Sequence, residues 1–197
     1  MLIRHAEPER DAPGCVEIYG PFANDTPVSF EERAPTEAEF SERITQISAH
    51  FPFLVAEQDG QVAGFAYASE HQQRPAYRWS VNASVYLGDG FRGLGLGSVL
   101  YRTLFSLLEQ QGFRTVLAGI TLPNPASVAL HRSLGFEEAG VYRNIGWKAG
   151  AWRDVVWLQR ALGPVLAQDV APPFPGPPAR LTSFSYEHPS GCELERS

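Results

Sequence analysis

Lysine is almost missing from this sequence of 197 residues: Lys148 is the only one, and arginine supplies the rest of the positive charge. The 16 basic residues are outnumbered by 22 acidic ones, the formal net charge is -6, and no basic run offsets this balance. Proteins that bind nucleic-acid phosphates non-specifically carry a basic patch instead. We therefore expect no nucleic-acid partner.

Cysteine and long apolar runs are scarce as well. Cys15 and Cys192 are far apart, a spacing that does not indicate a disulfide framework, and Cys15 is predicted to be a small buried hydrophobic residue rather than a nucleophile. No apolar run approaches the ~20 residues that span a bilayer, and the N-terminal MLIRHAEPERD lacks the apolar core of a secretory signal. The expectation is a protein of the reducing cytoplasm with no membrane partner.

The residues that are present indicate one domain followed by a tail. Residues 1–162 alternate predicted strands and helices, which is typical of an α/β domain with a mixed sheet. Residues 163–197 are crowded with proline between Pro164 and Pro178 and show little periodicity. We expect this segment to be an extended or disordered tail.

Hydrophobic periodicity and turn residues predict the individual elements. The predicted strands are 2–5, 28–31, 53–57, 62–69, 77–87, 116–121, 136–143 and 154–159. The predicted helices are 8–19, a helix behind the capping box at 36–39 that ends near 50, a helix that closes at 112, and 124–134. Loops are expected over 20–27, 70–75 and 146–152, and Asp59-Gly60 is expected to form a two-residue hairpin turn.

A glycine run between a predicted strand and an apolar helix is the first functional candidate. Arg92, Gly95 and Gly97 form an R-x-x-G-x-G pattern, and leucines at helical spacing follow it. Such a loop offers consecutive backbone N–H groups at the positive end of a helix dipole, which suits a pyrophosphate. The third glycine of the dinucleotide fingerprint and the Gly-Lys-Ser/Thr of the P-loop are absent. We therefore predict that residues 92–98 bind the phosphates of another large cofactor; a purely structural turn is the alternative.

A second candidate lies in the predicted helix 124–134. Asn124 is predicted as its N-cap, with Pro125 in the first turn. His131 lies two helical turns later on the same face. The alternative to a functional role is a partly buried histidine that is satisfied by the backbone.

Together these two stretches resemble the GNAT superfamily of acyl-CoA-dependent N-acyltransferases. The positions that match its phosphate loop and the later helix are Arg92, Gly95, Gly97, Asn124, Gly135 and Phe136. His131 stands where the superfamily usually has a tyrosine, the general acid that faces the coenzyme sulfur. The segments PFLVAEQDGQVAGFAYAS, RPAYRW, SVYLG and LPN are similar to the phosphinothricin N-acetyltransferase branch and its relatives that acetylate methionine sulfone or sulfoximine. This similarity runs over about 53–158.

The resemblance implies a GNAT fold, in which a mixed, mostly antiparallel sheet splays at the acetyl-CoA site and is flanked by helices. It also implies acetyl-CoA as cosubstrate, no metal, and a homodimer. The residues expected to contact the coenzyme are Val85, Tyr86, Leu87, Arg92, Gly93, Leu94, Gly95, Leu96, Gly97, Ser98 and Asn124. A backbone N–H of Val85 or Leu87 would donate to the thioester carbonyl, and Arg74 and Tyr77 would contact the substrate.

Two departures from the branch bear on the chemistry. Asn82 stands where the branch has a glutamate that is considered the general base, and Gln72 replaces a lysine that helps to hold an acidic substrate. An asparagine takes up no proton and can only orient water or the amine. The amine proton must then leave through water, through His131, or through a carboxylate that the sequence does not place. Asn82 and His131 are the catalytic candidates.

The expected function is transfer of the acetyl group from acetyl-CoA to the amine of a small amino-acid-like substrate, directly within a ternary complex. Another amine, such as a polyamine or a peptide N-terminus, is an alternative substrate. A non-catalytic acyl-CoA-binding protein is the alternative from a different class, and Asn82 favours it. A structural module, in which the glycine loop is only a turn, is a third.

Overall fold

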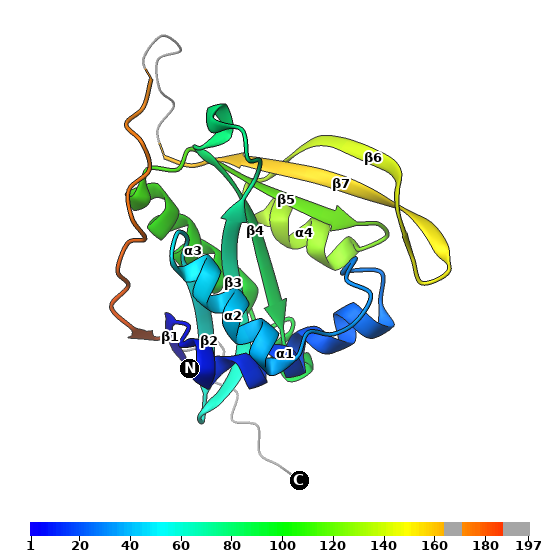
Figure 1. Cartoon of the computed structure of the whole chain (residues 1–197), viewed down its shortest axis with the longest axis horizontal. Coiled ribbons are helices and arrows are strands. Elements are labelled where there is room, and N and C mark those ends of the chain that lie inside the picture. Colours follow the sequence, from blue (N-terminus) through cyan, green and yellow to red (C-terminus); the bar gives the residue numbers. More distant parts are fainter. Residues whose placement is uncertain (164–170, 187–197) are drawn as a thin grey trace.

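The computed structural model describes residues 1–163 and 171–186. Its strands are β1 (Leu2–His5), β2 (Phe53–Gln58), β3 (Gln61–Glu70), β4 (Ser80–Leu87), β5 (Thr115–Thr121), β6 (Glu137–Lys148), β7 (Ala151–Ala161) and β8 (Phe184–Ser185). Its helices are α1 (Pro8–Asp25), α2 (Glu37–Ser48), α3 (Leu96–Gln111) and α4 (Pro125–Ser133), with 3₁₀ turns η1 (Pro75–Tyr77) and η2 (Asp89–Phe91). Within these residues the strands form one sheet in the order β6-β7-β5-β4-β3-β2-β1-β8, in which only β4 and β5 pair in parallel (Figure 1). The α/β class with a mixed, mostly antiparallel sheet is confirmed.

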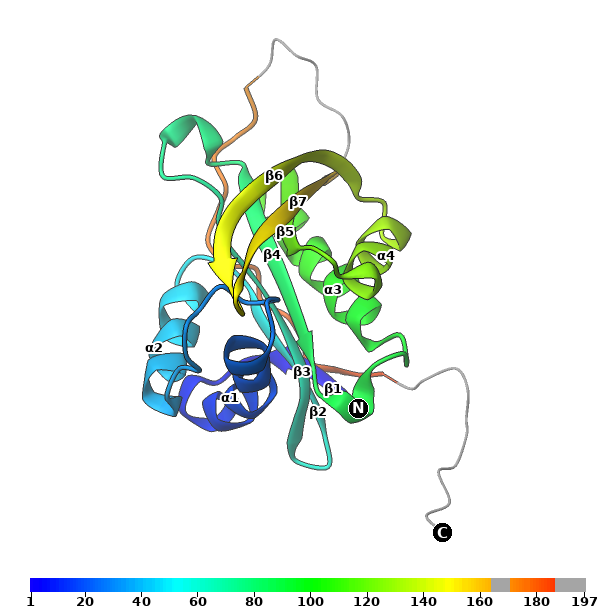
Figure 2. The same cartoon turned by 90° about the vertical axis from the view of Figure 1, so that its right-hand side faces the viewer.

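Helices cover both faces of this sheet (Figure 2). α1 and α2 pack on one face around Phe40, Phe53 and Phe65. α3 and α4 lie on the other face, where the leucines that sequence spacing assigned to one helix stripe are buried. Because a strand alternates its side chains between the two faces, the central strands contribute to both cores. A site in the middle of the sheet therefore has helices on both sides.

Two expectations near the N-terminus are wrong. α1 runs on through Gly20 and Pro21, which the sequence placed in a loop, because Tyr19 and its neighbours are buried against the sheet. This packing outweighs the poor helix propensity of glycine and proline. Residues 28–31 form no strand; the Ser29 hydroxyl instead lies 2.6 Å from the Tyr19 hydroxyl. A side-chain hydrogen bond therefore holds this loop on α1.

The predicted central strand 77–87 is shorter than expected. Pro75 opens the 3₁₀ turn η1, so Tyr77 lies in that turn and β4 begins at Ser80. Tyr77 therefore does not share the strand face of Val81, as the alternating pattern had predicted.

The expected loop 146–152 is also wrong. These residues continue the antiparallel ladder of β6 and β7. The turn between the strands is the pair Ala149-Gly150, whose φ angles of 51° and 72° are both positive. That geometry joins two strands in a tight hairpin, so β6 and β7 form one long arm.

The parallel pairing of β4 with β5 is short. Only residues 80–82 of β4 pair with residues 115–117 of β5. Beyond Asn82, β4 stays paired with β3 and β5 with β7, each on its far side. Residues 83–87 and 118–121 therefore turn unpaired backbone edges toward each other across a V-shaped opening, which we call the fork (Figure 1). The splayed sheet is confirmed.

Residues 171–186 lie along the outside of the domain (Figure 1). Trp79 Nε1 donates a hydrogen bond to the Pro173 carbonyl (2.9 Å), and β8 pairs with β1. Backbone groups thus hold this part of the proline-rich segment on the domain. The rest of the expected tail, Cys192 included, lies outside the described residues.

We predict that the N-cap of α2 stabilises the fold. Thr36 Oγ1 accepts a hydrogen bond from the Glu39 amide (3.2 Å), and the Glu39 carboxylate accepts one from the Thr36 amide (2.8 Å), which confirms the capping box. Thr36→Ala removes the first bond and should lower the free energy of unfolding by about 1 kcal/mol, measured by urea denaturation. Thr45→Ala, at an exposed position inside the same helix, is the control and should change it by less than about 0.5 kcal/mol. Equal losses in the two variants would contradict a specific role for the cap.

Candidate active site

The fork encloses a small cavity of about 70 Å³ between β4 and β5. Its walls come from both strands, from α3 and from α4, and they include Val85, Tyr86, Tyr101, Asn124 and His131. All of these except Tyr101 were predicted from the sequence as coenzyme contacts or catalytic groups. The fold therefore brings the strand candidates and the helix candidates to one place.

The glycine loop begins α3 at the end of β4. Gly93 and Gly95 both have a φ of +77°, a conformation that residues with a side chain disfavour. Gly95 is the N-cap of α3, and its carbonyl accepts the Ser98 amide (3.0 Å); the amides before Ser98 have no partner within the helix. Gly97 allows close packing, since a Cβ there would lie 3.3 Å from Leu130 of α4. The loop presents N–H groups at a helix start, which is the geometry that binds an anion.

The Arg92 side chain is already paired within the protein. Its guanidinium lies 2.7 Å from Asp89, and Nε donates to the Leu87 carbonyl (3.3 Å). Leu94 is exposed, whereas Leu96 is buried in the core. In this structure the loop therefore offers its backbone, rather than the Arg92 side chain, to a ligand.

His131 is only 3% exposed at the fork. Its Nδ1 lies 2.7 Å from the Ser127 carbonyl, which can only accept, so Nδ1 carries a proton. Its Nε2 lies 3.1 Å from the Tyr101 hydroxyl, whose proton the neutral ring accepts. Burial lowers the pKa of His131, and the bond to the Ser127 carbonyl offsets this only in part. The neutral ring is the favoured form.

Tyr101 is a member of the site that the sequence did not single out. Its hydroxyl contacts His131 and lies 3.4 Å from the Ala83 carbonyl of β4. Burial raises the pKa of this tyrosine and keeps its proton on the oxygen. In the sequence Tyr101 falls within the apolar stripe of α3, where an aromatic residue indicates core packing. Its polar partner comes from a different helix, so no local signal could have found the contact.

Asn124 caps α4, as predicted. Its Oδ1 accepts a hydrogen bond from the Ser127 amide (3.1 Å). The capping bond uses the side-chain oxygen, so the amide nitrogen of Asn124 remains as a donor at the wall of the fork cavity.

Asn82 is the last residue of β4 that pairs with β5, at the apex of the fork. Its Oδ1 lies 3.0 Å from Nδ1 of His71, and its Nδ2 donates to the Glu70 carbonyl (3.2 Å). His71 is the second residue that the sequence analysis missed, because a histidine in a polar loop carries no pattern of its own. The ring of Tyr77 also lies beside His71, and the two ring centroids are 5.9 Å apart. Arg74 is exposed just before η1.

The β6–β7 arm and the loop after α1 meet over the α1 side of the fork (Figure 2). Lys148 near the tip of the arm donates to the Ala23 carbonyl at the end of α1 (2.6 Å) and to the Glu31 carbonyl. Val28, in the same loop, lines the fork cavity, and its carbonyl lies 3.5 Å from the Thr121 hydroxyl of β5. The only lysine of the chain therefore ties the arm to the loop that covers the fork.

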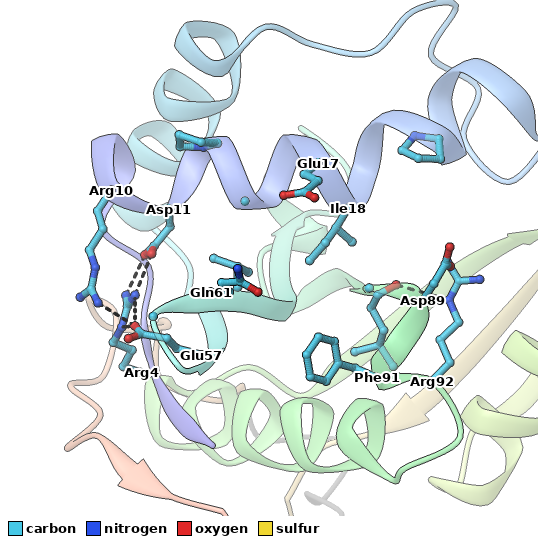
Figure 3. Close-up of a pocket in the computed structure, with 17 residues that line it drawn as sticks. Arg4, Arg10, Asp11, Glu17, Ile18, Glu57, Gln61, Asp89, Phe91 and Arg92 are labelled. Carbon is cyan, nitrogen blue, oxygen red and sulfur yellow. Dashed lines mark hydrogen bonds and ion pairs between the residues drawn. The ribbon is translucent and has the colours of Figure 1, made fainter. Parts of the chain in front are cut away.

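A larger cavity of about 550 Å³ lies beneath α1 (Figure 3). At one end Arg4 pairs with Asp11 and with Glu57, each at 2.7 Å, and at the other Arg92 pairs with Asp89. The hydrogen bond to Asp11 raises the pKa of Arg4, so the guanidinium stays charged. The charges around Arg4 neutralise one another inside the protein, whereas the Arg92–Asp89 pair is exposed to solvent. Two predicted residues, Leu87 and Arg92, line this larger cavity. We take the smaller fork cavity as the site, because it gathers predicted residues from β4 and from α4, including the catalytic candidate His131.

Two other kinds of site find no support in the part of the chain that the structure describes. No group of three or more histidine, cysteine, aspartate or glutamate side chains is placed to hold a metal ion there. None of the described helices is both long and apolar enough to cross a membrane.

Known proteins share both the fold and much of the sequence. The family described as an acetyltransferase (GNAT) domain matches residues 3–157. Phosphinothricin N-acetyltransferase of Streptomyces viridochromogenes is 39% identical over 150 residues, which cover 76% of this chain and 82% of that protein. L-methionine sulfoximine/L-methionine sulfone acetyltransferase of Pseudomonas paraeruginosa is 36% identical over 162 residues, which cover 78% and 91%. The crystal structure of a GNAT superfamily phosphinothricin acetyltransferase from Sinorhizobium meliloti in complex with AcCoA has a TM-score of 0.80 and 37% identity, covering 87% of this chain and 92% of that one.

We predict that His131 makes stability fall as the pH decreases. Its folded pKa is lowered from an unfolded value of ~6.5, so between the two values the unfolded chain binds more protons. The contribution of His131 to the free energy of unfolding is therefore fully present above about pH 6.5 and is lost as the pH falls toward the folded pKa. The total loss is about 1.4 kcal/mol for each pH unit that separates the two pKa values. Urea denaturation at pH 8 and pH 5.5 should show a smaller decline for His131→Gln than for the wild type. His50→Gln, at an exposed position, is the control; the same decline in all three proteins would contradict the assignment.

Proposed function

The chain belongs to the GNAT family of acetyltransferases, and from this premise we propose that it moves the acetyl group of acetyl-CoA to the primary amine of a small amino-acid-like substrate. Phosphinothricin and methionine sulfone or sulfoximine are the substrate types proposed, because relatives named for them are 39% and 36% identical to this chain. The observation that carries the proposal is the fork, where two diverging strands meet a glycine loop at a helix start.

The free groups of the fork suit the coenzyme. The amides at the start of α3 would hold its pyrophosphate. Residues 83–87 and 118–121 face each other but do not pair with each other. The amide-bearing pantetheine arm would therefore pair with these edges like an added strand. The side-chain amide of Asn124 would donate to the same arm. In this arrangement the sulfur end lies at the fork cavity.

The proposed chemistry is direct transfer in a ternary complex. Acetyl-CoA supplies an activated thioester, and the amine attacks it so that the C–N bond forms as the C–S bond breaks, with no covalent enzyme intermediate. A backbone N–H of Val85 or Leu87 donates to the carbonyl oxygen as negative charge develops. The Tyr101 hydroxyl, hydrogen-bonded to the catalytic candidate His131, gives a proton to the leaving thiolate and takes one from the attacking nitrogen, so that the buried hydroxyl ends protonated. Asn82 orients the amine at the apex of the fork, since an amide takes up no proton.

The acceptor amine would enter from the α1 and α2 face. Tyr77 is 45% exposed beside His71, and Arg74 is exposed on the same turn. A guanidinium at this place suits the carboxylate of an amino acid. We therefore assign Arg74 and Tyr77 to the substrate.

The proposal includes a homodimer in the cytoplasm. The β6–β7 arm exposes large apolar side chains, namely Tyr142, Ile145, Trp147 and Trp152, each at least 55% exposed. Trp147 and Trp152 lie against each other, with ring centroids 5.6 Å apart. Exposed apolar surface of this kind is typical of protein–protein contacts. Cys15 is a buried free thiol, which is compatible with a reducing compartment.

We predict that the purified protein releases free thiol from acetyl-CoA when methionine sulfone or phosphinothricin is added, and more slowly with a polyamine or a peptide. Because Gln72 carries no charge, kcat/KM for the more acidic phosphinothricin should be lower than for methionine sulfone, by about 10-fold for one lost charged hydrogen bond. Gln72→Lys should narrow that gap. Tight binding of acetyl-CoA with no thiol release for any amine would contradict the proposal and favour a non-catalytic acyl-CoA-binding protein.

A second prediction concerns the glycine loop. Gly95 has a φ of +77°, where a residue with a Cβ costs about 1–2 kcal/mol. Gly95→Ala should therefore distort the loop and raise the Kd for acetyl-CoA by about 10-fold, measured by calorimetry. Gly90→Ala is the matched control, because a Cβ there meets nothing within 4 Å, and its Kd should stay at the wild-type value. An unchanged Kd in Gly95→Ala would place the pyrophosphate elsewhere.

A further inference from the structure

We propose that His71 is the base that takes the proton of the acceptor amine, and that Asn82 positions it. This inference rests on the proposed function and answers the question that function leaves open. Asn82 lies at the apex of the fork and takes up no proton itself. The side chain that contacts Asn82 is an imidazole, and imidazole is the side-chain group best suited to gain and lose a proton near neutral pH.

His71 lies on the amine side of the sheet. In the β3–β4 ladder Ser69 is directly opposite Asn82, and His71 follows two residues later, beyond the end of β3. Asn82 alternates with Val81 and Ala83, which are buried in the core on the α3 and α4 side, so its side chain points to the α1 and α2 face. His71 therefore stands across the sheet from His131, which α4 brings to the opposite face.

The contact with Asn82 decides which nitrogen of His71 is free. The Glu70 carbonyl can only accept, so the Asn82 amide nitrogen faces it (3.2 Å) and the Asn82 oxygen faces Nδ1 of His71 (3.0 Å). An amide oxygen can only accept, so Nδ1 carries the proton and the lone pair of the neutral ring lies on Nε2. No described side chain hydrogen-bonds this Nε2, which is therefore available to a substrate amine.

Two aromatic rings fix the plane of the imidazole. Tyr77 and Trp157 both lie edge-on to His71, with ring centroids 5.9 Å away and interplanar angles of 77° and 75°. Trp157 in turn lies across Gly119 of β5, where a Cβ would come within 3.2 Å of the indole. Gly119 is part of the wall of the fork cavity. One indole ring thus spans the distance from His71 to the cavity.

The contacts leave His71 without a competing charge. Of the described groups that touch its ring from η1, β4 and β7, Tyr77 is the only one that titrates. The Asn82 oxygen stabilises the Nδ1–H that the base needs, in the way that a carboxylate orients the histidine of a hydrolytic triad. The step balances when both nitrogen protons are followed. One ammonium proton passes to Nε2 of His71, the neutral amine attacks the carbonyl, and the C–S bond breaks. The thiolate takes a proton from Tyr101, and the second proton of the attacking nitrogen returns to Tyr101, so the products are the amide, the free thiol and one proton on His71.

The test is the pH dependence of kcat/KM for methionine sulfone, measured together with the Kd for acetyl-CoA. His71→Gln should lower kcat/KM by about 100-fold at pH 7 and leave the Kd for acetyl-CoA within about twofold. The deficit should shrink as the pH rises, because more of the amine is then already neutral. The acidic limb that protonation of His71 imposes on the wild type should be absent. Imidazole added to His71→Ala should restore part of the rate, which a purely structural histidine would not show.

Asn82→Asp tests the role of His71 in a second way, in a variant that keeps the histidine. The aspartate keeps the acceptor for Nδ1–H and adds a negative charge, which stabilises the protonated ring and should move the acidic limb to higher pH. His50→Gln is the control and should keep the wild-type profile.

An unchanged acidic limb in His71→Gln, or a rate within about threefold of the wild type, would overturn the role of His71 and leave the proposed function intact. Failure of the wild type to acetylate any amine would overturn the proposed function itself.

Discussion

The end of pairing between β4 and β5 after Asn82 is the constraint on which the rest of the structure depends. Had the ladder continued, hydrogen bonds between the strands would have used the backbone groups of both edges. Because it stops, residues 83–87 and 118–121 keep facing edges that an amide-bearing ligand can join. α3 and α4 then fill one face of the opening and bring Tyr101 and His131 to it.

In the proposed reaction the fork also separates the two proton transfers. His131 and His71 lie on opposite faces of the sheet, and each uses Nδ1 for a hydrogen bond to a group that can only accept: the Ser127 carbonyl and the Asn82 amide oxygen. In both rings Nε2 is consequently the nitrogen left to exchange a proton in the proposed reaction. On the coenzyme side Tyr101 already meets it; on the amine side it is free for the substrate. In the proposed reaction Asn82 thus orients the base, His71, and takes up no proton itself.

Charge pairing explains why the larger cavity beneath α1 has a different character. The carboxylates of Asp11 and Glu57 neutralise the positive charge of Arg4. A buried charge is tolerated only with such partners. Backbone groups that neither the helix nor the sheet pairs lie elsewhere, at the start of α3 and along the edges of the fork. A ligand that carries a pyrophosphate and amides finds its complement there.

Signals that depend on a few neighbouring residues determined much of this protein from the sequence alone: the α3 stripe, the caps at Thr36 and Asn124, the glycine loop, and the α/β class. Expectations failed where distant packing outweighs local preference, as in α1 beyond Tyr19 and in the arm formed by β6 and β7. The contacts of His71 with Asn82 and of Tyr101 with His131 carry no sequence pattern. They exist only because particular strands and helices become neighbours. Periodicity and capping act within about a helical turn of chain, whereas a hydrogen bond between two elements requires the tertiary fold.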